Sequence, residues 1–152
     1  MTYGSLFEAL AGQPEIARTL AAHLRACGDE GTVGRRVKEL IALMVGWLNA
    51  CDYCTCVHEE IAQHLGISTE TLASLGDYAR SPHFTDAERA ALAATVSLTR
   101  EPRALPPNLM DALHAQYTPE QCVEIVAAIG LNNYLSRVSN ALGVKPPSSA
   151  PA

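Results

Sequence analysis

Apolar residues recur every three or four positions through most of this chain, the spacing that places side chains on one face of a helix. The first such stretch covers residues 4–27, and Gly12 and Pro14 divide it, so that Pro14 can open a second helix. The next stretch starts at Gly31 or Thr32. It carries apolar residues on so many sides that we expect its helix to be buried over most of its surface.

A fourth helix is predicted from Cys51 or Asp52 to Leu65, because Gly66 suits the position that follows a helix end. Two later helices begin with a capping box, in which a threonine and a Glu or Gln three positions on bond each other's backbone N–H groups. No stretch alternates apolar and polar residues as a strand would, so we expect an all-α protein with about seven helices. The later helices are predicted over residues 68–75, 85–99, 109–116 and 118–142, with capping boxes at Thr85/Glu88 and Thr118/Gln121.

The length of 152 residues and the hydrophobic content of 48% suit one domain with a substantial core. We place this domain at residues 1–145. Residues 146–152 are rich in Pro, Ser and Ala, a composition typical of a disordered tail.

The charge distribution limits the classes of partner. The net charge is -5 and the eleven basic residues are scattered, which argues against binding to nucleic acid or to an anionic membrane surface. The longest apolar-rich run, Leu40 to Ala50, is too short to cross a bilayer, and the first twenty residues lack the pattern of a signal peptide. We therefore expect a soluble, cytoplasmic protein.

Reactive side chains gather between Glu39 and His58, where three of the five cysteines lie. In a reducing compartment a Cys-x-x-Cys pair is typically catalytic or metal-binding. Cys51 and Cys54 stand one turn apart at the predicted start of a helix, close enough to form a disulfide. The positive end of the helix dipole favours thiolate, and such cysteines have pKa values of roughly 3.5–7.5, against about 8.5 for a free cysteine.

A histidine and a carboxylate accompany the dithiol. His58 follows Cys54 by four residues, hence on the same helix face, and can exchange a proton with it directly or through a water. Glu39 lies in an apolar helix, where a carboxylate needs a partner, and His58 is the best candidate. The carboxylate would orient the imidazole, and the imidazole would take the thiol proton. Tyr53, between the cysteines, could bridge them through its hydroxyl.

The order of Glu39, Cys51, Tyr53, Cys54 and His58 resembles the carboxymuconolactone decarboxylase superfamily, and within it the alkylhydroperoxidase D-like branch. The resemblance implies an all-helical fold and a homotrimer or homohexamer. It also implies that Cys51 and Cys54 form the redox pair and that Glu39 and His58 form the proton relay.

The resemblance covers roughly residues 10–145 and has two departures. Tyr53 stands where the best-known peroxidase of the branch has a histidine, so the relay must differ there. Cys56 is an additional thiol, and we expect it to point to the other side of the helix and to serve in packing.

The predicted activity is the reduction of hydroperoxides, because the decarboxylase branch typically lacks the dithiol. Cys54 would attack the peroxide and become a sulfenic acid, and Cys51 would condense with it to a disulfide. An external dithiol, of thioredoxin or lipoyl type, would then restore the pair. The same site could instead reduce a protein or lipoyl disulfide, with Cys51 as the first attacker if it is the more exposed sulfur. The cycle requires no cofactor and no metal.

Three alternatives stay open. The protein could be a carboxymuconolactone decarboxylase-like enzyme, which would turn over a lactone without any thiol requirement. It could bind zinc through Cys51, Cys54, Cys56 and His58, although a regular helix places the last two poorly for one tetrahedral site. It could also be a non-catalytic oligomeric scaffold, in which loss of Cys54 would change no activity.

Overall fold

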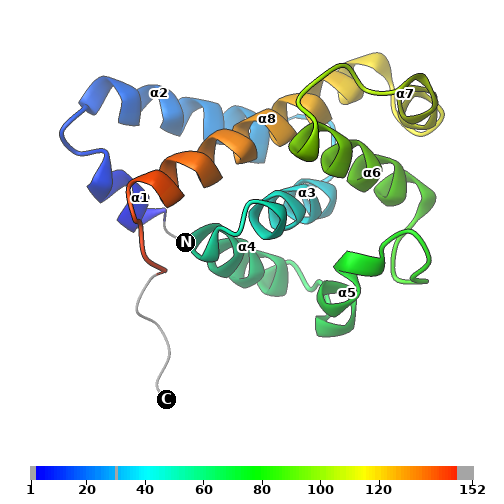
Figure 1. The fold of residues 1–152 in the computed structure, drawn as a ribbon, viewed down its shortest axis with the longest axis horizontal. Coiled ribbons are helices and arrows are strands. Elements are labelled where there is room, and N and C mark those ends of the chain that lie inside the picture. The colour runs from blue at the N-terminus through cyan, green and yellow to red at the C-terminus, as the bar shows by residue number, and fades with distance from the viewer. Residues whose placement is uncertain (1–2, 30, 147–152) are drawn as a thin grey trace.

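The computed structural model describes residues 3–29 and 31–146, and the regular elements in these ranges are all helical (Figure 1). The all-α prediction is confirmed, and the predicted boundaries agree to about one turn of helix. Residues 147–152 of the predicted tail lie outside the described residues. The α-helices of the described ranges are α1 (Gly4–Ala9), α2 (Pro14–Leu24), α3 (Arg35–Leu48), α4 (Asp52–His64), α5 (Thr69–Ala73), α6 (Asp86–Arg100), α7 (Pro107–His114) and α8 (Pro119–Ala141). A π-helical turn (Arg25–Asp29) continues α2, and a 3₁₀ turn (Leu75–Asp77) follows α5.

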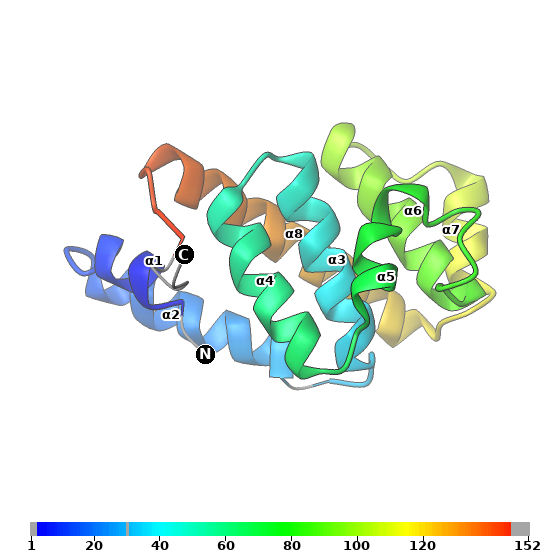
Figure 2. The ribbon, with the colours of Figure 1, turned by 90° about the horizontal axis from the view of Figure 1, so that it is seen from below.

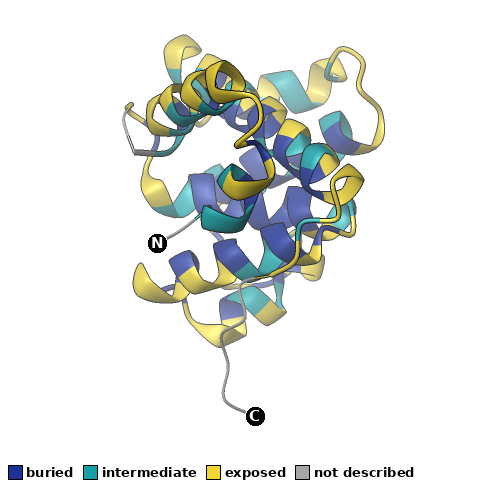
Figure 3. Cartoon of the chain, turned by 90° about the vertical axis from the view of Figure 1, so that its left-hand side faces the viewer, coloured by how far each residue is buried: buried dark blue, intermediate teal, exposed yellow. Residues whose placement is uncertain are grey.

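Helix α3 is the centre of the molecule, and α4, α6 and α8 pack around it (Figures 1 and 2). Every residue from Lys38 to Gly46 is buried, as the wide apolar pattern of this helix predicts. Figure 3 shows the same distribution over the described residues, with buried positions toward the centre and exposed ones at the periphery. None of the helices in the described ranges combines the length and the apolar character needed to cross a membrane.

The start of α3 differs from the prediction. The sequence pattern places it at Gly31 or Thr32, whereas the helix begins at Arg35. The reason is a tertiary contact: the Glu124 carboxylate of α8 accepts hydrogen bonds from the backbone N–H groups of Thr32 and Val33. These two residues therefore form a loop that is bound to α8.

Three clusters of buried apolar side chains connect the helices. One joins α3 to α6, α7 and α8, and a second joins α3 to α4 and α6. The third connects α1, α2, α4 and α8 and includes both Cys51 and Cys54. Leu6 of α1 and Leu131 of α8 belong to this third cluster, so the N-terminal helices cover the cysteine pair.

Side chains set the ends of the later helices as predicted. Thr85 accepts from the Glu88 N–H, and Glu88 accepts from the Thr85 N–H, which completes a capping box at the start of α6. Thr118 and Gln121 form the second box at the start of α8. Gly143 follows α8 with φ +63°, a conformation that glycine adopts without a Cβ clash.

Replacing Thr85 with alanine should remove the side-chain cap of α6. We expect a loss of about 1 kcal/mol in the free energy of unfolding. For a chain of this size that loss lowers Tm by roughly 2–4 °C, which a thermal melt followed by circular dichroism would measure. Thr19→Ala is the matched control, because Thr19 is exposed within α2 and caps no helix. Equal melting temperatures for Thr85→Ala and wild type would contradict the prediction.

Candidate active site

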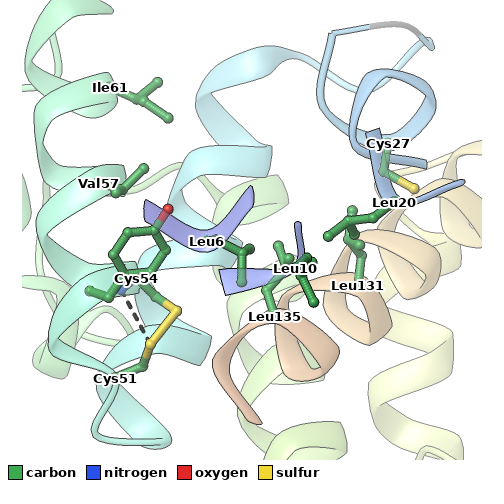
Figure 4. Close-up of a cluster of buried hydrophobic side chains, with 11 residues drawn as sticks. Leu6, Leu10, Leu20, Cys27, Cys51, Cys54, Val57, Ile61, Leu131 and Leu135 are labelled. Atoms are coloured by element: carbon green, nitrogen blue, oxygen red, sulfur yellow. Dashed lines mark hydrogen bonds between the residues drawn. A yellow bond between two sulfur atoms is a disulfide. The ribbon is translucent and has the colours of Figure 1, made fainter. Parts of the chain in front are cut away.

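The turn between α3 and α4 holds the two cysteines together. Ala50 takes the left-handed conformation (φ +48°), and the Cys51 N–H donates to the Gly46 carbonyl at 2.9 Å. Cys51 is the N-cap of α4, where its Sγ accepts the Cys54 N–H at 3.2 Å. The two sulfurs form a disulfide across a Cα–Cα distance of 5.3 Å (Figure 4). The first turn of α4 thus supplies the whole dithiol.

Gly46 allows α3 to approach α4 closely at this point. A Cβ at Gly46 would lie 3.2 Å from the Thr55 hydroxyl oxygen and 3.3 Å from the Cys54 Cβ, closer than ordinary van der Waals contact. A side chain here would therefore require the Thr55 hydroxyl and the Cys54 Cβ to shift by a few tenths of an ångström.

The predicted Glu39–His58 contact is present and buried. His58 Nδ1 lies 2.7 Å from Glu39 Oε2, and each residue is 4% exposed. The second oxygen, Oε1, accepts a hydrogen bond from Arg35 Nε at 3.1 Å. Since both carboxylate oxygens have partners, the buried charge is compensated and its geometry is fixed. Arg35, one turn before Glu39 on α3, is a site residue that the sequence reasoning missed.

Tyr53 lies in the apolar cluster that contains Cys51 and Cys54, and its hydroxyl does not bridge the two cysteines. Its side chain is 2% exposed, and its hydroxyl has no hydrogen-bond partner among the described residues. Burial raises the pKa of the Tyr53 phenol, and the nearby Leu6 backbone offsets only part of this effect. Tyr53 therefore stays protonated at neutral pH and packs against the disulfide.

The other cysteines stand apart from the pair. Cys56 is a free thiol of intermediate exposure, and Cys27 and Cys122 are free and buried. Burial raises the pKa of both buried thiols, which makes them poor nucleophiles. In the described part of the chain no three His, Cys, Asp or Glu side chains converge as ligands of one metal ion, so the four residues of the zinc alternative do not form one site.

A cavity of about 290 Å³ opens beside the Glu39–His58 pair. Its walls are largely apolar, with cationic side chains from Arg25, Arg35 and Lys38. Among the described residues, Cys51 and Cys54 do not line it. They are 1% and 7% exposed, and they share a buried apolar cluster with Leu6 of α1 (Figure 4).

Glu124 is a further residue that sequence reasoning missed, and it anchors the segment that leads into the site. Its carboxylate pairs with Lys38 Nζ at 2.6 Å and accepts the Thr32 N–H at 2.8 Å. Gly31 takes φ +108° beside it, and a Cβ there would collide with the carboxylate. The available signal was a carboxylate among the apolar residues of α8, the same pattern that identified Glu39.

The helical fold, with a Cys-x-x-Cys disulfide beside a buried Glu–His pair, defines a protein of alkylhydroperoxidase D-like architecture. The chain belongs to the carboxymuconolactone decarboxylase family, whose model matches residues 14–97. The match includes Glu39, both cysteines of the pair and His58.

Known proteins resemble this chain in sequence or in fold. YdfG, an uncharacterised protein of Bacillus subtilis, is 27% identical over 115 residues, which are 75% of this chain and 78% of YdfG. A structure from Agrobacterium tumefaciens, of unknown function and proposed as the antioxidant defence protein AhpD, superposes with a TM-score of 0.86. It is 25% identical, over 92% of this chain and 96% of that one. The debrominase Bmp8 superposes with a TM-score of 0.83 at 22% identity, over 91% of this chain and 75% of its own, which shows the common fold alone.

Replacing Glu124 with glutamine should destabilise the protein, because the buried Lys38 ammonium loses this carboxylate. We expect a loss of about 3 kcal/mol at pH 7, measured by urea denaturation. Burial opposes ionisation of Glu124, but the bonds from Lys38, Thr32 and Val33 outweigh it and hold the pKa of Glu124 below its ordinary 4.5.

A group with a lowered folded-state pKa stabilises the fold above its unfolded pKa, and this contribution is lost as pH falls through the folded value. The difference in the free energy of unfolding between wild type and Glu124→Gln should therefore become smaller below pH 4.5. The double variant Lys38→Met/Glu124→Gln removes both charges and keeps an acceptor for the Thr32 N–H. It is the control and should recover most of the loss in the free energy of unfolding at pH 7. If the difference in the free energy of unfolding between wild type and Glu124→Gln did not depend on pH, the charge of the Glu124 carboxylate would have no role in stability.

Proposed function

We propose that the protein is a thiol-dependent peroxidase that reduces hydroperoxides with the Cys51/Cys54 pair. The observation that carries this proposal is the buried Glu39–His58 hydrogen bond of 2.7 Å, one turn along α4 from a cysteine pair at bonding distance. The carboxylate holds His58 by Nδ1, which leaves Nε2 as the nitrogen that takes up and returns protons.

The cycle balances with these groups alone. The Cys54 thiol gives its proton to His58, and the thiolate attacks the terminal oxygen of the hydroperoxide. The O–O bond breaks, Cys54 becomes a sulfenic acid, and the alkoxide leaves as an alcohol with the proton from His58. The Cys51 thiol then condenses with the sulfenic acid, and a disulfide and one water form.

An external dithiol closes the cycle by thiol–disulfide exchange and is itself oxidised. Cys51 is 1% exposed and Cys54 is 7% exposed. This low accessibility favours a slender reductant of lipoyl type over a protein such as thioredoxin, which would reach the sulfurs only if α1 moved. Cys54 is the more exposed sulfur, so we propose it as the first target of the reductant as well.

The remaining features of the proposal follow from the family and the composition. A homotrimer or homohexamer is proposed from the family resemblance, and the reducing cytoplasm is the compartment that suits a catalytic dithiol. The fold itself supports more than one reaction, as the likeness to a debrominase illustrates, so the choice rests on the site. A lactone decarboxylase would need no dithiol, whereas here a Cys-x-x-Cys disulfide accompanies the Glu–His pair.

The proposal predicts a specific loss of thiols. One equivalent of cumene hydroperoxide added to the reduced protein should remove two thiols from wild type and none from Cys54→Ser, counted with a chromogenic disulfide under denaturing conditions. Cys51→Ser should stop at a sulfenic acid on Cys54, which dimedone would trap. Cys56→Ser is the matched control and should lose two thiols like wild type. Unchanged thiols in wild type would exclude the peroxidase.

The relay predicts a second result. Glu39→Gln keeps the shape of the side chain but removes the negative charge that lies against His58 Nδ1. The second-order rate of hydroperoxide consumption at pH 7 should fall about ten- to a hundredfold, a part of what general acid–base groups contribute. Glu60→Gln makes the same charge change on the exposed side of α4 and should keep the wild-type rate. Equal rates for both variants would remove Glu39 from the mechanism.

A further inference from the structure

Tyr3 brings a phenol to the histidine of the relay. Its hydroxyl oxygen lies 3.5 Å from His58 Nε2, at the long end of the hydrogen-bond range. The two rings meet edge to face, with centroids 6.0 Å apart and planes inclined by 66°. Catalytic hydrogen bonds are often long in unliganded proteins and shorten in the reacting complex.

The atom that Tyr3 contacts is the one on which proton transfer depends. Glu39 occupies Nδ1 of His58, so any proton that leaves Cys54 for this imidazole must arrive at Nε2. A neutral Nε2 is an acceptor and a protonated Nε2 is a donor. A phenol hydroxyl can donate to the first and accept from the second, so Tyr3 can serve both states. A phenylalanine could serve neither.

The surroundings of Tyr3 support the same role. Tyr3, Glu39 and His58 all line the 290 Å³ cavity, whereas the disulfide, among the described residues, does not reach it. Tyr3 therefore lies where the relay meets the cavity. The helix that follows, α1, places Leu6 in the apolar cluster that contains the disulfide, so one short segment covers both the relay and the dithiol.

We propose that Tyr3 is a positioning residue of the dithiol site, whose hydroxyl holds His58 Nε2 in both protonation states and thereby assists removal of the Cys54 proton. The proposal rests on the assignment of Cys54 and His58 in the proposed function. Tyr3 precedes the family match at residues 14–97, so the role belongs to this chain's own N-terminal segment.

The test follows the reactivity of Cys54 with iodoacetamide in the reduced protein, between about pH 6 and 10, by mass spectrometry of the Cys54 peptide. One net hydrogen bond is worth about two- to tenfold in rate. Tyr3→Phe should be slower than wild type by this factor near pH 7 and should converge with it at high pH, where hydroxide forms the thiolate without the relay. Tyr134→Phe, an exposed tyrosine on α8, should follow the wild-type profile.

Phe7→Leu separates positioning from packing, because Phe7 lines the same cavity from α1 and does not bond His58. Phe7→Leu should change the rate of Cys54 alkylation by the same factor at every pH. A Tyr3→Phe profile that matches wild type, or that falls by one factor at every pH as in Phe7→Leu, would overturn the role of the hydroxyl. Alkylation requires no peroxide, so a wild type that fails to consume hydroperoxide would defeat the proposed function and leave this result intact.

Discussion

The contact on which the site depends is the hydrogen bond between Glu39 and His58 in the centre of the molecule. A carboxylate that is 4% exposed persists only because His58 and Arg35 each take one of its oxygens. That requirement fixes the separation and rotation of α3 and α4, and Gly46 permits the close approach that follows. The position of α4 in turn determines the position of the cysteine pair, because both cysteines lie at the start of this helix. The need of the buried Glu39 carboxylate for hydrogen-bond partners therefore sets the geometry of the reactive groups.

The parts of this structure that could be predicted from sequence are those set by neighbouring residues. The capping boxes at Thr85 and Thr118 are local, and so is the three-residue spacing of the cysteines, which is why both are present as expected. The start of α3 was misplaced because a side chain some ninety positions later, Glu124, holds the preceding loop. Tyr3 could not be found either, since 55 residues separate it from His58 and no spacing rule links them.

The family supplies an architecture, and the reaction depends on what each member places around the central helix. Here a disulfide pair, a carboxylate and an imidazole occur together, and a tyrosine stands between the cysteines. Tyr53 is buried in the same apolar cluster as the two cysteines, and its hydroxyl has no hydrogen-bond partner among the described residues. In the proposed cycle the proton path runs through His58 and the groups that reach its second nitrogen.

The position of the disulfide inside an apolar cluster has a thermodynamic consequence. Leu6, Leu131 and Leu135 pack around Cys51 and Cys54, and the oxidised and reduced pairs differ in shape and polarity. Any packing change that favours one form over the other shifts the dithiol–disulfide equilibrium by the same free energy, with about 30 mV for each 1.4 kcal/mol. The reduction potential of this protein is thus a property of its leucines as well as of its cysteines, and substitutions remote from every ionisable group can tune it.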